Sequence, residues 1–137
     1  MSVTSIPEPV KALLYEHIHA FEELEALILL HRNPDKGWTE RSVAEALAIS
    51  DDLAADALKM LTARGIVDAF ELDDSGTYYR GPREVFRAVV SELVAVYDQS
   101  RLEIVMQLSA NSIERMRTGA MRAFANAFFI GKRKKDG

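Results

Sequence analysis

The apolar pattern of this 137-residue chain changes its period at Arg64-Gly65, and that change limits the possible folds more than any other feature. Before it, apolar residues recur every three or four positions, which is typical of helices packed on one face. After it, residues 66–72 and 77–80 are rich in β-branched and aromatic side chains. Asp73-Asp74-Ser75-Gly76 separates them, and Gly76 can adopt the positive φ of a tight turn. The sequence therefore predicts short helices followed by one β-hairpin.

Helices are expected before the hairpin at residues 8–18, 21–31, 40–48 and 51–64. The stretch Asn33-Pro-Asp-Lys-Gly37 is dense in residues that interrupt helices, so the second helix ends there and Trp38 is left for a very short strand. Thr39 and Ser50 are good N-caps, because a hydroxyl can accept a hydrogen bond from an otherwise unpaired backbone amide. In the helix over 51–64, the positions expected to face the core are Leu53, Ala54, Ala57, Leu58 and Leu61.

After Gly81-Pro82 the sequence predicts one long helix over 83–108 and a last helix over 112–129. Asn111, with Glu114 three positions later, fits a capping box that would start the last helix. The apolar surface of the helix over 83–108 is too broad for one contact face, which favours packing on its own domain and on a second copy. The residues expected at this dimer interface are Phe86, Val90, Leu93, Tyr97, Ile104, Phe124 and Phe128.

A single domain over 1–137 is expected, because 48% hydrophobic and 28% charged residues are the mix of a compact soluble domain. We divide it into a core over 21–82, C-terminal helices over 83–130 for packing and dimerisation, and a basic tail over 131–137 that should fray. The absence of cysteine excludes disulfides, thiol catalysis and thiolate zinc sites. The longest apolar runs are five residues, far short of the ~20 of a membrane span, and the N-terminus does not resemble a signal peptide. We therefore expect a cytoplasmic protein that makes no membrane contact.

Charge is distributed unevenly around a net charge of −4. Residues 38–82 carry four basic and nine acidic side chains. Residues 83–137 carry ten basic and six acidic ones, and they include the run Lys132-Arg133-Lys134-Lys135. A polyanion should therefore be attracted to the C-terminal part and repelled by the middle.

The order of elements over 21–80 resembles the winged helix-turn-helix domain of bacterial transcriptional regulators of the MarR and PadR type. The most specific part is Leu58 to Val67, which is similar to the end of the recognition helix and the start of the wing in those regulators. Ser42 to Leu47 likewise resembles their supporting helix. The resemblance implies a mainly α fold with a small β-hairpin and extra N- and C-terminal helices, a symmetric dimer formed by those helices, and binding of double-stranded DNA through the major groove.

The outward face of the helix over 51–64 carries more acid than a DNA-binding surface should. It presents Asp52, Asp56 and Lys59, and the turn of the hairpin adds Asp73 and Asp74. Carboxylates at these places repel phosphates, whereas affinity for DNA comes largely from Lys and Arg. The candidate DNA contacts are Lys59, Thr62, Arg64, Arg80, Arg83, Lys132, Arg133, Lys134 and Lys135.

Two functions stay open at this point. One is a DNA-associated transcriptional regulator that acts as a dimer. The other is a winged-helix adaptor that binds a regulatory protein partner and no DNA. A catalytic function is not expected, because the seven glycines never lie two apart as in a dinucleotide-binding loop. His17 and His19 point about 200° apart on a helix, so they cannot share a metal ion without a third element. We therefore expect no enzyme activity, no metal and no cofactor.

Overall fold

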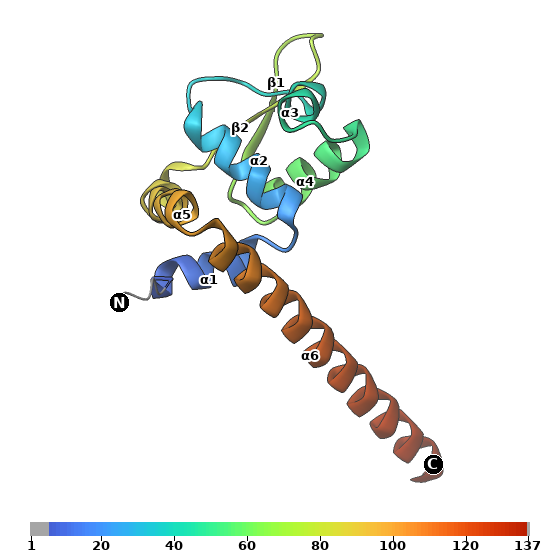
Figure 1. Cartoon of the computed structure of the whole chain (residues 1–137). Helices are drawn as coiled ribbons and strands as arrows, with labels where there is room; N and C mark the ends of the chain where they lie inside the picture. The colour runs from blue at the N-terminus through green and yellow to red at the C-terminus, as the bar shows by residue number, and fades with distance from the viewer. Residues whose placement is uncertain (1–5, 137) are drawn as a thin grey trace, which may run out of the picture.

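Helices make up most of the structure, a computed structural model that describes residues 6–136 of the chain, with side chains described through residue 127. Figure 1 shows the elements in order. They are α1 (Glu8–His17), α2 (Phe21–Arg32), α3 (Glu40–Leu47), α4 (Asp51–Ala63), β1 (Asp68–Glu71), β2 (Thr77–Arg80), the 3-10 turn η1 (Glu84–Phe86), α5 (Arg87–Gln99) and α6 (Arg101–Asp136).

Hydrogen-bonded caps start α3 and α4, as the sequence predicts. The Thr39 side chain accepts from the Ser42 amide at 3.0 Å, and the Ser42 hydroxyl accepts from the Thr39 amide at 2.9 Å. The Ser50 hydroxyl accepts from the Leu53 amide at 3.2 Å. Between the two helices, Ala48 adopts a left-handed conformation with φ of 57°. This tight connection holds α4 against α3 as the second helix of a helix-turn-helix unit.

The hairpin forms with the predicted turn. Gly76 has φ of 101°, and β1 pairs antiparallel with β2 in a register that runs from Asp68–Arg80 to Glu71–Thr77. Trp38 forms the expected very short strand, because its backbone makes an isolated bridge to Tyr79. The first strand is shorter than the predicted 66–72: Ile66 and Val67 are buried at its base and precede the ladder. Gly65, at φ of 82°, ends the α4 segment as expected.

The core lies between α2, α3 and α4 and continues onto α1, α5 and the start of α6. Leu24, Leu27 and Leu58 are among the side chains with no exposed surface. Ala54, Ala57, Leu58 and Leu61 of α4 face inward as predicted. Leu53 does not, because it lies in the first turn at the outer edge of α4 and is 45% exposed.

The C-terminal helices divide at a different residue from the one predicted. The helix expected over 83–108 ends at Gln99, and Ser100 breaks it, with φ of −146° and ψ of 63°. The second helix starts at Arg101, so Asn111 is an interior position of α6 and no N-cap. Asn111 is only 6% exposed, and its side-chain oxygen accepts from Gln107 at 2.9 Å. The break has a physical reason, because Leu93 and Ile104 must both enter the core from segments that run in different directions (Figure 1).

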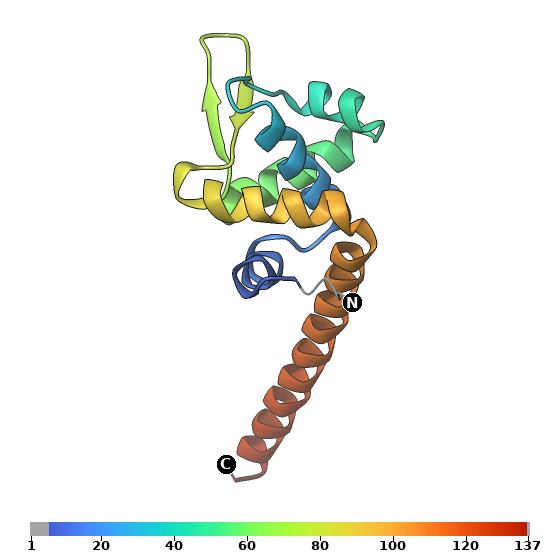
Figure 2. The same cartoon turned by 60° about the vertical axis from the view of Figure 1, so that its left-hand side comes forward.

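Beyond the core, α6 continues as a long helix that leaves the rest of the molecule. Figure 2 shows it running away from the hairpin, with the C-terminus at the far end. Between residues 116 and 127 every side chain is exposed except Ala125, which is half-buried. The helix continues to Asp136, so the backbone of 131–136 is helical where a frayed tail was expected. The whole is a winged helix-turn-helix fold with extra terminal helices.

Candidate nucleic-acid interface

The outer face of α4, the second helix of the helix-turn-helix unit, is turned toward solvent. Asp52, Asp56 and Lys59 are exposed there, and Thr62 is half-buried. The Thr62 hydroxyl donates to the Leu58 carbonyl oxygen at 2.7 Å. Among the described residues, no carboxylate forms an ion pair with Lys59. Lys59 is therefore the cation of this face that is available to a phosphate.

Arg64 is placed differently from the sequence-based expectation. Its guanidinium forms an ion pair with Glu23 and donates to the His17 carbonyl oxygen at 3.0 Å. The Arg64 side chain is only 15% exposed and points toward the connection between α1 and α2. Since a buried, paired guanidinium cannot reach a phosphate, this finding removes Arg64 from the candidate DNA contacts.

Arg80 and Arg83 lie at the base of the hairpin and are both exposed. The Arg80 guanidinium lies 5.1 Å from the centre of the Phe70 ring, a cation-π arrangement that orients it along the sheet. Arg83 Nε lies 3.5 Å from Asp68 Oδ1. Such an exposed pair contributes little to stability, so Arg83 can exchange Asp68 for another anion at small cost.

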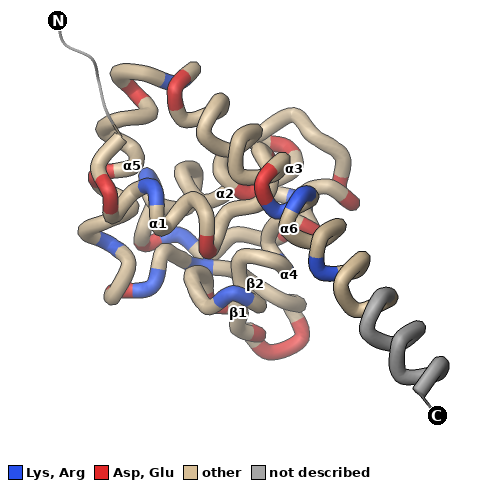
Figure 3. The backbone as a smooth tube through the Cα atoms, turned by 90° about the horizontal axis from the view of Figure 1, so that it is seen from below, with Lys and Arg blue, Asp and Glu red and all other residues tan. Residues whose placement is uncertain are grey.

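The acidic residues gather at the two places that the sequence indicated. Figure 3 shows a red stretch of backbone, the colour of Asp and Glu, at the turn beside β1 and β2. This turn contains the exposed Asp73 and Asp74. Arg41 offsets part of the acid beside α4, because it lies 3.6 Å from Glu45 and 3.9 Å from Asp51. The outer surface of α4 and the hairpin turn is therefore acidic. Among the described residues Lys59 and Arg80 form no ion pair, and Arg83 forms only the exposed pair with Asp68.

The basic run at the C-terminus does not reach this surface within one protomer. The side chains of Lys132, Arg133, Lys134 and Lys135 lie outside the described residues. The backbone that carries them belongs to α6, which runs away from the hairpin (Figures 1 and 2). A single copy of the chain therefore keeps its basic run and its α4 face at opposite ends.

The residues expected at a dimer interface divide into three groups. Val90, Leu93 and Ile104 have no exposed surface and belong to the core of the protomer itself, so they cannot line a contact with a second copy. Phe86 and Tyr97 are half-buried against that core. Phe124 is 74% exposed, whereas the side chain of Phe128 lies outside the described residues.

Tyr79 connects the hairpin to the helix-turn-helix unit. Its hydroxyl donates to Glu40 Oε2, at the start of α3, at 3.0 Å. Its backbone exchanges hydrogen bonds with Trp38 at 2.8 and 2.6 Å. Burial, and then the hydrogen bond to Glu40 and the charge of that carboxylate, raise the pKa of Tyr79 to about 12. The hairpin is therefore positioned relative to α3 by a neutral, buried phenol.

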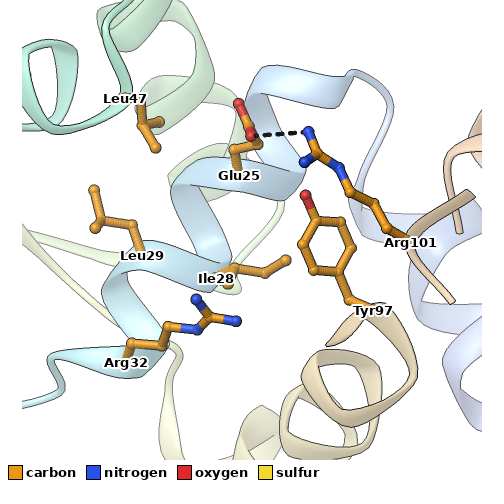
Figure 4. A pocket seen from close by; sticks show the side chains of 7 residues that line it. All are labelled: Glu25, Ile28, Leu29, Arg32, Leu47, Tyr97 and Arg101. Atoms are coloured by element: carbon orange, nitrogen blue, oxygen red, sulfur yellow. Dashed lines mark ion pairs between the residues drawn. The ribbon is translucent and has the colours of Figure 1, made fainter. Parts of the chain in front are cut away.

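A small cleft of about 270 Å³ lies where α2 faces the junction of α5 and α6 (Figure 4). Glu25 and Arg32 come from α2, and Tyr97 and Arg101 from the junction. Two ion pairs cross it: Arg32 lies 2.6 Å from Asp98, and Arg101 lies 3.8 Å from Glu25. The cleft is thus bridged by contacts that hold the α5–α6 junction against α2.

Within the residues that the structure describes, no three histidine or carboxylate side chains converge as metal ligands would. No helix of this part of the chain combines the length and the apolar character needed to cross a bilayer.

Comparison with known proteins identifies the fold of this chain but not its family. No protein-family model and no curated protein matches the sequence. Among solved structures, the DNA complex of MepR from Staphylococcus aureus matches with a TM-score of 0.53 at 16% identity, over 81% of this chain and 89% of that one. A winged helix-turn-helix DNA-binding domain from Mycobacterium bovis, described as a homodimer and a possible ArsR-family regulator, matches with a TM-score of 0.53 at 20% identity, over 73% and 93%.

A third match is the heme sensor protein PefR from Streptococcus agalactiae in complex with heme. Its TM-score is 0.53 at 17% identity, over 85% of this chain and 80% of that one. All three are transcription-regulator or sensor folds at low identity, and they share with this chain the winged helix-turn-helix fold.

Proposed function

We propose that this protein is a DNA-associated transcriptional regulator that acts as a homodimer in the cytoplasm and has no catalytic activity. The observation that carries the proposal is the exposed outer face of α4, which holds Lys59 and stands beside a hairpin with Arg80 and Arg83 at its base. In helix-turn-helix proteins the second helix of the unit enters the major groove. MepR, which shares the fold, is known in complex with DNA.

In this arrangement Lys59 and Thr62 lie at the major groove, where Lys59 contacts a phosphate at its edge. Arg80 and Arg83 contact phosphates of the flanking backbone. The last four basic residues, Lys132 to Lys135, add positive charge from the C-terminal end of α6. Phosphate contacts of this kind orient a protein on the duplex, while base-edge contacts specify sequence. Because α4 offers one long cation and one hydroxyl, we expect modest sequence selectivity.

The number of available cations predicts the salt dependence of binding. Lys59, Arg80 and Arg83 give three phosphate contacts per protomer and six per dimer. For duplex DNA the slope of log K against log salt concentration is about −0.9 per contact, so we expect a slope of about −5. The acidic residues around these cations lower affinity without adding to this slope.

Fluorescence anisotropy with a random-sequence duplex at low ionic strength tests the proposal. The full chain should bind, and binding should weaken steeply as salt is added. Lys59→Ala should weaken binding and reduce the slope by about two, one contact from each protomer. Lys11→Ala is the matched control, because Lys11 lies on α1, far from the hairpin, and pairs with Glu8. Absence of binding at low ionic strength would reject DNA association.

A second function is favoured by the same acidic surface. Asp52, Asp56, Asp73 and Asp74 are all exposed, and together they suit a partner protein with a basic surface. Under this alternative the protein is a winged-helix adaptor that binds no DNA directly. The anisotropy titration separates the two, because the adaptor gives no signal change at any salt concentration.

Dimerisation is the part of the proposal that rests on α6. Leu102, Ile113 and Phe124 each expose more than half of their surface, an unusual amount for large apolar side chains along one helix. Light scattering coupled to size exclusion should give twice the mass of the 15.3 kDa chain. A single 15.3 kDa species at every concentration would contradict it.

A further inference from the structure

Helix α6 has two apolar faces that point in opposite directions. One face holds Ile104 and Leu108, which are buried in the core of the protomer. About half a turn away, Leu102 is 70% exposed, Met106 60% and Ile113 58%. The second face continues along the part of the helix that leaves the molecule, where Met116 is 71% and Phe124 74% exposed. The fold therefore leaves a long apolar stripe on α6 without cover in the protomer.

This stripe has the spacing of a coiled-coil seam. Met106, Ile113, Ala120 and Ala127 follow one another at intervals of seven. A second series with the same spacing consists of Leu102, Ser109, Met116 and Ala123. Along the helix the two series alternate, in steps of four and then three positions. Alternating steps of four and three are the a/d pattern of two helices that pack side by side. The eight positions contain no charged residue, so the seam can be buried against another helix.

The sizes of the side chains change along the seam. Its first half contains Leu102, Met106, Ile113 and Met116, whereas its second half contains Ala120, Ala123 and Ala127. In a parallel pair, large residues would meet large residues at one end and alanines would meet alanines at the other. The distance between the helix axes would then have to change along the pair, because it depends on the side chains at the contact. An antiparallel pair avoids setting the alanines of one helix against the alanines of the other.

We propose that α6 pairs with α6 of a second copy of this chain as an antiparallel two-stranded coiled coil, with its two-fold axis level with Asn111. The proposal rests on the homodimer of the proposed function and specifies its contact. In this register Leu102 packs on Ala120 of the partner subunit. Met106 packs on Met116 of the partner subunit, and Ser109 on Ile113 of the partner subunit. Each layer then combines a large with a small side chain or two of equal size.

Charge complementarity supports the same orientation. Glu103 and Arg117 lie on the same flank of the seam, one position after Leu102 and Met116. Among the described residues neither side chain forms an ion pair. In the antiparallel register, Glu103 lies almost level with Arg117 of the partner subunit, and the two-fold axis repeats the pair.

The apolar area of the seam is a large part of what a specific dimer needs. Leu102, Met106, Ile113 and Met116 each leave roughly 100 Å² exposed, so two copies offer about 800 Å² before the flanking residues are counted. Specific interfaces bury a total of about 1,200 Å² or more. Ala120 and the residues that flank the seam add to the buried area.

The antiparallel register also changes where the basic run ends. Residue 121 of the partner subunit lies level with Arg101, the first residue of α6. Residues 122–136 of the partner then extend about 22 Å further, past the break at Ser100, toward the side on which α2, α4 and the hairpin lie (Figure 1). Each protomer thus carries its C-terminal lysines toward the acidic half of the other.

Single cysteine variants test the orientation, because the chain has no cysteine of its own. Met106→Cys and Met116→Cys are prepared separately, one with a short tag that changes its size, and are oxidised alone and after mixing. The antiparallel coil predicts a disulfide only in the mixture, because identical positions lie ten residues, about 15 Å, apart along the axis. Ser75→Cys at the hairpin turn, mixed with either variant, is the control and should not cross-link.

Each other outcome overturns the proposal in a distinct way. Cross-linking of Met106→Cys with itself means a parallel pair. Dimeric mass by light scattering without cross-linking in the mixture means that a different surface forms the dimer. Monomeric mass of the unmodified chain rejects the dimer altogether. None of these measurements contains DNA, so they are independent of the anisotropy test of DNA association.

A charged seam residue provides a second check on the same surface. Ile113→Asp should convert the dimer to a monomer with unchanged helix content by circular dichroism, because Ile113 is 58% exposed and makes no core contact. Glu114→Ala, at the neighbouring exposed position outside the seam, should remain dimeric. A dimeric Ile113→Asp variant would contradict the assigned seam.

Discussion

Arg64, which caps the C-terminal end of α4, forms an ion pair with Glu23 in the first turn of α2, and both side chains are almost fully covered, at 15% and 7% exposed. The pair does not stand alone. Arg64 also donates to the His17 carbonyl oxygen, and Glu23 accepts from the His19 amide at 2.7 Å. One guanidinium and one carboxylate therefore fix the connection between α1 and α2 to the end of the helix that we propose contacts DNA.

Arg64→Ala should destabilise the protein strongly. It leaves the Glu23 carboxylate buried without its counter-charge, and breaking a buried pair in this way costs about 3–5 kcal/mol. Urea unfolding followed by circular dichroism measures the loss. Arg32→Ala is the matched control, because its partner Asp98 is 57% exposed and such surface pairs contribute at most about 1 kcal/mol. Equal losses for the two variants would contradict a structural role for Arg64.

Asp56→Asn should strengthen DNA binding. Asp56 is exposed on the same face of α4 as Lys59, so its carboxylate repels a phosphate that approaches that face. Removing the charge should raise affinity about threefold at low ionic strength, with a smaller gain at high salt where charges are screened. Anisotropy titration measures the change, and Glu92→Gln on α5 is the control. If Asp56→Asn binds no better than Glu92→Gln, the outer face of α4 does not approach DNA.

Tyr79 should cause a loss of stability at high pH. Its pKa is about 12 in the folded protein, whereas an unfolded tyrosine ionises near pH 10. A raised pKa means that the folded state holds the proton longer, so the contribution is complete below pH 10 and is lost as pH rises toward 12. Unfolding free energies of the natural chain and of Tyr79→Phe should therefore converge over this interval. A constant difference between the two chains from pH 9 to pH 12 would show that Tyr79 does not titrate in this way.

Gly81→Ala should disturb the base of the hairpin. A Cβ atom at Gly81 would lie 2.9 Å from Val67 Cγ2 and 3.3 Å from the Val67 backbone. Because Val67 is buried and the backbone contact cannot rotate away, overpacking should cost about 1–3 kcal/mol. Thermal unfolding measures the cost. Ser75→Ala, at an exposed position of the turn, should change stability by less than about 0.5 kcal/mol.

Local signals explain which elements were predicted correctly. Thr39, Ser50, Gly65 and Gly76 act through their own backbone or the next turn of helix, and each does in the structure what its residue type predicts. The position of Arg64 could not be predicted in this way. Its partner lies 41 positions away, and no pattern within α4 distinguishes an arginine that turns inward from one that turns outward.

Asn111 shows how a local signal can mislead. Asn111 and Glu114 have the residue types and the spacing of a helix start, and only the packing of Asn111 against the core shows that the helix continues through it. Dividing α6 at this residue separated Leu102 and Met106 from Ile113 and Met116. The seven-residue spacing that joins them spans the division, so the seam could not be recognised in either half.

Ser100 is the only residue between α5 and α6, so one joint sets the angle between the helix-turn-helix half and the helix that we propose joins two copies. Two partly exposed ion pairs across the cleft, Arg32–Asp98 and Arg101–Glu25, brace that joint. Successive major grooves on one face of DNA recur about every 34 Å, and two α4 helices can enter them together only at a matching separation. Because salt weakens exposed pairs, we expect the distance between the two α4 helices of the proposed dimer to change with ionic strength while the core of each protomer stays folded.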